Sequence, residues 1–200
     1  MSEHLFVAVV GIFTLILLAL LLRPLLNAAK KQEGIFNELA NKFNGKVNLV
    51  KREFNLYVTG LTFSHQGIDI LFCGSAAYSK GVAERFFLEA EMPNIKKHKF
   101  FLMDNTPFNL FKIKGVEANF NLVKGFRIYC SNTTWFSNIL TPDMQQKLND
   151  QKDFIEKVSF SEGKFKVRYF SFMELTNDVS KIEELINTAL QLINNINAAS

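Results

Sequence analysis

Hydrophobic positions in this chain form one long unbroken run, several alternating stretches and two helical stripes. The unbroken run extends from Leu5 to Leu22, with Thr14 as its only hydroxyl residue. A bilayer core about 30 Å thick requires roughly 20 helical residues. No lysine or arginine precedes the run and no small-residue cleavage site follows it, which favours a permanent signal-anchor over a cleaved export signal. The pattern therefore predicts a transmembrane anchor over residues 1–26.

Basic residues flank this run on one side only. Arg23, Lys30 and Lys31 follow it, whereas residues 2–4 contain no lysine or arginine. The positive-inside rule then predicts an outside N-terminus and a cytoplasmic C-terminal domain, with those three residues at the membrane interface. We expect a single-pass membrane protein that contacts the lipid bilayer through residues 5–22.

The two helical stripes bracket the rest of the chain. The first covers about residues 27–43, and Asn44-Gly45 follows it as a stop signal. The second covers about residues 177–198 and has a single apolar stripe suited to packing on a sheet. That stripe consists of Val179, Ile182, Ile186, Leu190, Ile193 and Ile196.

Alternating apolar and polar positions between these helices predict strands. Strands are expected at Phe54–Val58, Ile68–Cys73, Arg85–Met92 and Phe126–Cys130, as well as in the hairpin described next. Pro93-Asn94 predicts a turn that returns the third of these strands as a hairpin. In that hairpin Glu89 would face Lys99, and Glu91 would face Lys97, as favourable cross-strand charge pairs.

The clearest local signal is a hairpin over residues 154–172. A two-residue Glu162-Gly163 loop pairs Val158 with Val167 and Phe160 with Phe165. Two short helices are expected just before it. The second begins at Thr141 as cap and Pro142 at the first helical position.

These elements define the expected fold class. It is α+β, with an N-terminal transmembrane helix at 1–26 and one domain at 27–200. In that domain a largely antiparallel sheet is flanked by an N-terminal and a C-terminal helix.

Composition narrows the functional classes. The chain has 200 residues, 21 of them phenylalanine, and a net charge of +4. This aromatic-rich composition argues against disorder, and the charge is too small to predict a nucleic-acid partner. Two distant cysteines, Cys73 and Cys130, lie in predicted strands and are interpreted as buried structural residues.

Motifs for the common enzymatic chemistries are absent. The sequence contains no phosphate-binding GxxxxGK[ST], no GxGxxG and no GxSxG. His4, His65 and His98 are isolated from one another, without the one-turn spacing of a zinc site. We therefore assign no catalytic, cofactor-binding or metal-binding residue, and we expect no cofactor.

One basic feature remains, on the solvent side of the predicted hairpin. Lys157, Lys164, Lys166 and Arg168 share that side, and Lys157 directly faces Arg168 as a like-charge pair. A merely solvated surface is the simplest interpretation. An uncompensated basic face could also contact anionic lipid or an acidic partner.

The second half resembles a group of uncharacterised bacterial single-span membrane-anchored proteins. The resemblance rests on Phe120-Asn121, the strand from Phe126 to Ser131-Asn132, Leu140 with TPDMQQKL, Glu162-Gly163 and the terminal helix. The chain departs from that pattern at Glu117-Ala118-Asn119, where those proteins have Gly-Asp. The resemblance implies a membrane-anchored α+β domain and no particular activity.

The expected function is accordingly that of a non-enzymatic scaffold or accessory subunit at the cytoplasmic membrane face, with a membrane protein as a possible partner. The alternative is a module that binds anionic lipid or another anionic ligand through the basic face of the 154–172 hairpin.

Overall fold

The computed structural model describes residues 13, 30, 32–51, 57–75, 85–104, 126–170 and 178–200. Within these ranges eight strands form one antiparallel sheet, in the order β1-β2-β3-β4-β8-β7-β5-β6. The strands are β1 Lys46–Lys51, β2 Tyr57–His65, β3 Ile68–Ser75, β4 Arg85–Glu91, β5 Phe100–Asp104, β6 Phe126–Cys130, β7 Ile155–Ser161 and β8 Lys164–Phe170.

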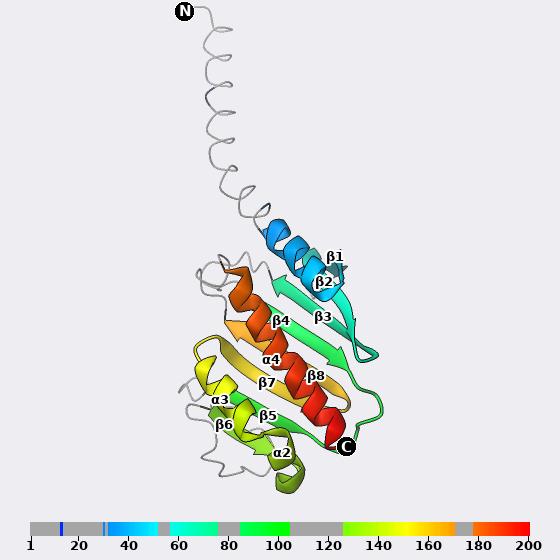
Figure 1. Cartoon of the computed structure of the whole chain (residues 1–200), viewed down its shortest axis with the longest axis vertical. Helices are drawn as coiled ribbons and strands as arrows, with labels where there is room; N and C mark the ends of the chain where they lie inside the picture. The colour runs from blue at the N-terminus through cyan, green and yellow to red at the C-terminus, as the bar shows by residue number, and fades with distance from the viewer. Residues whose placement is uncertain are drawn as a thin grey trace, which may run out of the picture.

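The helices complete an α+β architecture, as the sequence predicts. They are a helix over residues 32–43, α2 Thr133–Ile139, α3 Pro142–Asp150 and α4 Val179–Ala198. Figure 1 shows α4 running diagonally across the sheet, with the 32–43 helix near β1 and β2 and with α2 and α3 near β5 and β6.

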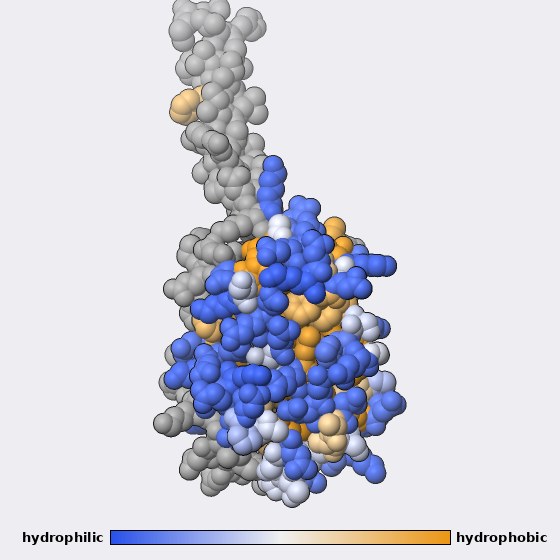
Figure 2. Space-filling model, in the orientation of Figure 1, coloured by the Kyte–Doolittle hydropathy of each residue, from blue (hydrophilic) through white to orange (hydrophobic). Residues whose placement is uncertain are grey.

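The first helix, α2 and α4 pack against the same face of the sheet, which we call the helix face, and α3 packs against α4. Phe36 of the first helix stacks on Phe72 of β3, with ring centroids 5.7 Å apart. At the other end, the rings of Phe136 in α2 and Phe100 in β5 lie 5.1 Å apart. The residues buried along α4 include five of the six positions in its predicted stripe, and the sixth, Val179, is partly buried. Figure 2 shows mostly hydrophilic atoms over this helix-covered side.

Local sequence signals predict the C-terminal half well. The β7–β8 hairpin pairs Val158 with Val167 and Phe160 with Phe165, as expected. Asn132, Thr141 and Asp178 cap the starts of α2, α3 and α4 by accepting a backbone N–H at their side chains. Pro142 occupies the first turn of α3.

The predicted hairpin at Pro93-Asn94 is wrong. β4 pairs with β3 and β8, and β5 pairs with β6 and β7. Glu89 therefore faces Lys166 and Glu91 faces Lys164, instead of Lys99 and Lys97. The alternation within β4 is nevertheless as predicted, because Phe86, Leu88 and Ala90 are buried on the helix face.

The strand boundaries near the N-terminus also differ from the prediction. The expected strand at Phe54–Val58 lies partly outside the described residues, which resume at Tyr57 in β2. β1 follows the first helix directly and was not expected. It is an edge strand on which Leu49 is 73% exposed, so it lacks the buried alternation that identifies a strand in a sequence.

The assignment to single-pass membrane proteins requires a correction. None of the helices among the described residues combines the length and the apolar composition needed to cross a bilayer. α4 is long enough, at 20 residues, but its apolar positions form one stripe that is buried on the sheet. The described residues therefore do not support the prediction of a signal-anchor protein with an outside N-terminus and a cytoplasmic domain. The span predicted at Leu5–Leu22 itself lies outside the described residues, apart from Phe13.

Two glycines with nearly the same left-handed backbone test how closely the sheet elements pack. Gly163 has φ of 76° and Gly67 has φ of 78°. A Cβ at Gly163 would lie 2.7 Å from the backbone oxygen of Met92, whereas a Cβ at Gly67 would meet nothing within 4 Å. The Gly163 carbonyl also accepts a hydrogen bond from the Met92 N–H.

We expect Gly163→Ala to destabilise the protein by about 2–4 kcal/mol, because it adds a backbone clash to the left-handed strain. Gly67→Ala incurs only the strain, about 1 kcal/mol. Urea unfolding of the two variants measures the difference. Equal losses of stability would contradict the close packing of the β7–β8 turn on the segment after β4.

Candidate functional site

The sheet face opposite the helices is the candidate site, and we call it the open face. Side chains alternate along each strand, so residues adjacent to the core positions point to this face. No helix among the described residues packs against it. The β8 side chains on this face, Lys164, Lys166 and Arg168, alternate with the buried Phe165, Val167 and Tyr169.

The strand register arranges the open face in rows that cross the sheet. One row runs through Phe87, Arg168, Lys157, Met103 and Arg127. The next row runs through Glu89, Lys166, Ser159, Phe101 and Tyr129. Lys164 lies in a third row between Glu91 and Ser161. The register thus brings all four basic residues singled out in the sequence onto one surface.

Basic and aromatic side chains are interleaved on this surface. The Lys166 ammonium lies 5.0 Å from the Phe87 ring centroid, and the Arg168 guanidinium lies 5.7 Å from the same centroid. The Lys157 ammonium lies 5.2 Å from the centroid of Phe101. Each distance is within the range of cation–π attraction. We call Phe87, Phe101, Lys157, Lys164, Lys166 and Arg168 the basic–aromatic strip.

Two glutamates compensate part of this charge, which the sequence interpretation missed. Glu89 forms an ion pair with Lys166 at 2.6 Å. Glu156 accepts a hydrogen bond from Arg168 at 3.1 Å, and its side chain is only 15% exposed. The expectation of an uncompensated face is therefore wrong. Lys157 does face Arg168, as predicted.

A β-bulge explains why Glu156 was missed. The ladder between β7 and β8 shifts register between Ile155 and Lys157. At such a bulge two residues of one strand oppose a single residue of the other. Strict alternation from Val158 would place Glu156 in the core. The bulge instead allows it to reach Arg168 while Ile155 remains buried.

Lys157 is affected both by its partial burial and by the charges of the side chains around it. Partial burial lowers the pKa of its ammonium group below 10.5, Arg168 lowers it further, and Glu156 partly opposes both effects. Because the folded pKa is lowered, the unfolded chain binds this proton more tightly. Lys157 therefore makes the folded state more stable as the pH rises from its folded pKa toward its unfolded pKa.

The other residues considered from the sequence have structural surroundings. His65 shares a 3.0 Å hydrogen bond with Asn194 of α4, and His98 stacks on Trp135 with centroids 4.6 Å apart. Cys73 and Cys130 are both buried, and burial raises the pKa of the Cys130 thiol. Among the described ranges, no cluster of three or more histidine, cysteine, aspartate or glutamate side chains could hold a metal ion.

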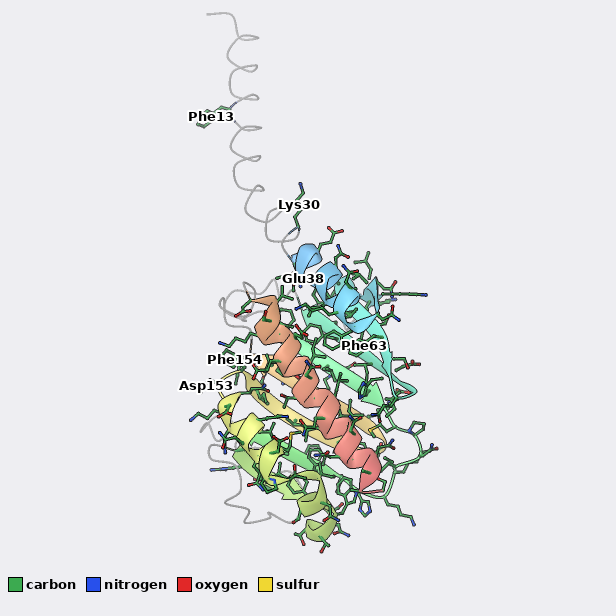
Figure 3. The ribbon with its side chains drawn as sticks, viewed as in Figure 1. Phe13, Lys30, Glu38, Phe63, Asp153 and Phe154 are labelled. Carbon is green, nitrogen blue, oxygen red and sulfur yellow. The ribbon has the colours of Figure 1, made fainter. Side chains whose placement is uncertain are left out.

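Of the three residues predicted at a membrane interface, the structure describes only Lys30, and Lys30 does not join this surface. Arg23 and Lys31 lie outside the described residues, and Lys30 is exposed. Figure 3 shows Lys30 ahead of the helix over residues 32–43, away from the strands that carry the strip.

Comparison with known proteins yields a relationship of fold alone. No model of a known protein family matches the chain, and no curated protein matches its sequence. One similar solved structure is the crystal structure of the mycobacterial trehalose monomycolate transport factor A, TtfA. Its TM-score is 0.57 at 7% sequence identity, and the match covers 84% of this chain and 94% of that one. The resemblance of the second half to uncharacterised bacterial proteins stays a prediction.

The compensation by Glu156 leads to a prediction about stability. We expect Glu156→Gln to destabilise the protein by about 1–3 kcal/mol, because Arg168 loses its charged acceptor and its repulsion with Lys157 is no longer balanced. Adding Lys157→Met should restore part of that loss. Urea unfolding of the single and double variants measures the coupling between the two positions.

Glu162→Gln provides the matched control, because Glu162 is an exposed residue in the turn of the same hairpin. That substitution should change stability by less than about 0.5 kcal/mol. If Glu156→Gln were as stable as this control, Glu156 would have no role in balancing the strip.

Proposed function

We propose that this chain is a non-enzymatic accessory domain that binds lipids with anionic head groups on the open face of its sheet. The single observation that carries the proposal is the basic–aromatic strip, where four basic side chains from β7 and β8 lie with two phenylalanines on a face without a described helix. The contacts would come chiefly from Lys157, Lys164, Lys166 and Arg168.

Lipid surfaces match this combination of side chains. Basic residues near an anionic leaflet contribute about 1 kcal/mol each, and aromatic rings favour the head-group region. Glu89 and Glu156 already pair with Lys166 and Arg168, so those two cations contribute less. The structure describes no ion pair for Lys157 or Lys164, and these two should dominate the electrostatic contact.

The fold comparison gives limited further support. The mycobacterial protein with a similar fold is described as a transport factor for trehalose monomycolate. A lipid-related accessory role for this chain is consistent with that description. The non-enzymatic part of the proposal is supported by the absence from the sequence of the nucleotide-binding, serine-hydrolase and zinc-site patterns considered above.

The proposal predicts that binding depends on the strip. Lys157→Gln combined with Lys164→Glu should weaken binding of the full chain to phosphatidylglycerol vesicles by about tenfold or more, since three unit charges are removed from the contact. The measurement is vesicle flotation. The fraction of protein that floats with phosphatidylglycerol vesicles is divided by the fraction that floats with neutral phosphatidylcholine vesicles. This ratio isolates the electrostatic contribution to binding.

A control variant carries the same change in net charge elsewhere. Lys97→Gln combined with Lys152→Glu alters exposed lysines in the segment after β4 and just after α3. This variant should keep the preference for anionic vesicles, and salt should reduce the preference of the parent chain. An equal loss in both variants, or no preference in the parent chain, would disprove the proposed function.

A further inference from the structure

A polar cleft lies on the open face beside the basic–aromatic strip. Its volume is about 890 Å³, within the range of small-molecule sites. It is lined by β1, β2, β3, β4 and β8, together with the turn at Asn44. The register places Thr62, Leu71, Glu89 and Lys166 side by side along one row of its floor.

The charges that line this polar cleft are balanced. Its carboxylates are Asp69, Glu89 and Glu91, and its ammonium groups are Lys46, Lys164 and Lys166. Glu89 and Lys166 pair with each other at 2.6 Å. The structure describes no ion pair for Asp69, Glu91 or Lys164, so their acceptors and donors are available to a ligand.

Neutral polar groups complete the lining together with the apolar residues Phe63, Ile70, Leu71, Ala90 and Phe165. Asn44, Thr62 and Ser64 supply an amide and two hydroxyl groups. Asn48 already donates to the Thr62 hydroxyl at 3.1 Å, which holds that side chain in a defined orientation. Leu71 is half-buried on the same face and presents an apolar surface to the cleft.

From this chemistry we infer that the polar cleft binds a neutral polyhydroxylated group, such as the sugar of a glycoside or glycolipid. Each hydroxyl of a sugar both donates and accepts, so it can donate to the carboxylates of the cleft and accept from its ammonium groups. A phosphate would meet three carboxylates, and a polycation would meet three lysines. A ligand without net charge avoids both repulsions, while its C–H surface can pack on Leu71.

This inference goes beyond the proposed function and does not depend on it. Lipid contact requires the cations of the strip, whereas sugar binding requires the acceptors Asp69 and Glu91. Removing those two negative charges weakens the sugar site, but it leaves or strengthens attraction to an anionic vesicle. One double variant therefore separates the two proposals.

The experiment titrates the full chain with maltose, sucrose and trehalose and follows the Leu71 methyl signals by NMR. We expect saturable shifts with at least one of these sugars. Asp69→Asn combined with Glu91→Gln keeps the side-chain shapes and should weaken that binding by about tenfold or more, since hydrogen bonds to charged acceptors are lost. Retention of the same variant on phosphatidylglycerol vesicles should not fall.

The control is Glu38→Gln combined with Asp153→Asn, two exposed carboxylates that Figure 3 shows outside the strands of the cleft. It should bind sugar like the parent chain. Three results would each overturn the inference: no saturable shift with any of the sugars, an equal loss in the control, or stronger saturation of the Leu71 signals by inorganic phosphate or spermine than by the sugars.

Discussion

Burial of one sheet face beneath helices is the interaction on which the rest of this structure depends. α4 supplies much of it, since Ile186, Ile193 and Ile196 are fully buried. The hydroxyl of Tyr169 in β8 donates to the Leu185 carbonyl of α4 at 3.1 Å, which satisfies a polar group inside that apolar layer. The apolar burial that stabilises the domain therefore comes largely from one side of the sheet, and the other side can carry charged residues at little cost.

The central pairing of β4 with β8 assembles the candidate sites. It brings Phe87 beside Arg168 and Glu89 beside Lys166, although these strands lie far apart in the sequence. From the paired strands β4 and β8, the basic–aromatic strip extends toward β5 and the polar cleft extends toward β1. Lys164 and Lys166 belong both to the strip and to the cleft. A ligand that carries a sugar and an anionic group could therefore contact the two surfaces on either side of the β4–β8 pairing.

The sequence predicts the features that depend on neighbours along the chain. Glu162-Gly163 determines a turn and hence a register, and Thr141-Pro142 determines a helix start. The partner of β4 has no such local signal, because Ala90 pairs with Phe165 across a long sequence separation. The Pro93-Asn94 turn, with Lys97 and Lys99 after it, therefore predicted that β4 pairs with the next segment of the chain, whereas its partner is β8. The contact of Glu156 with Arg168 was not predicted for another reason. A bulge breaks the alternation of side chains from which the face of each residue is inferred. The polar cleft needs five elements at once and has no signature in any one of them.

The long separation between β4 and β8 also constrains how the chain folds. The meander β1–β4 can pair through local connections as it is synthesised, but β4 remains an unpaired edge until β8 has emerged. Contacts of this kind slow folding, and an exposed edge can pair with another chain. Glu89 and Glu91 place negative charge along that temporary edge. The same carboxylates that later face lysines of β8 would keep nascent copies of the protein from pairing with one another.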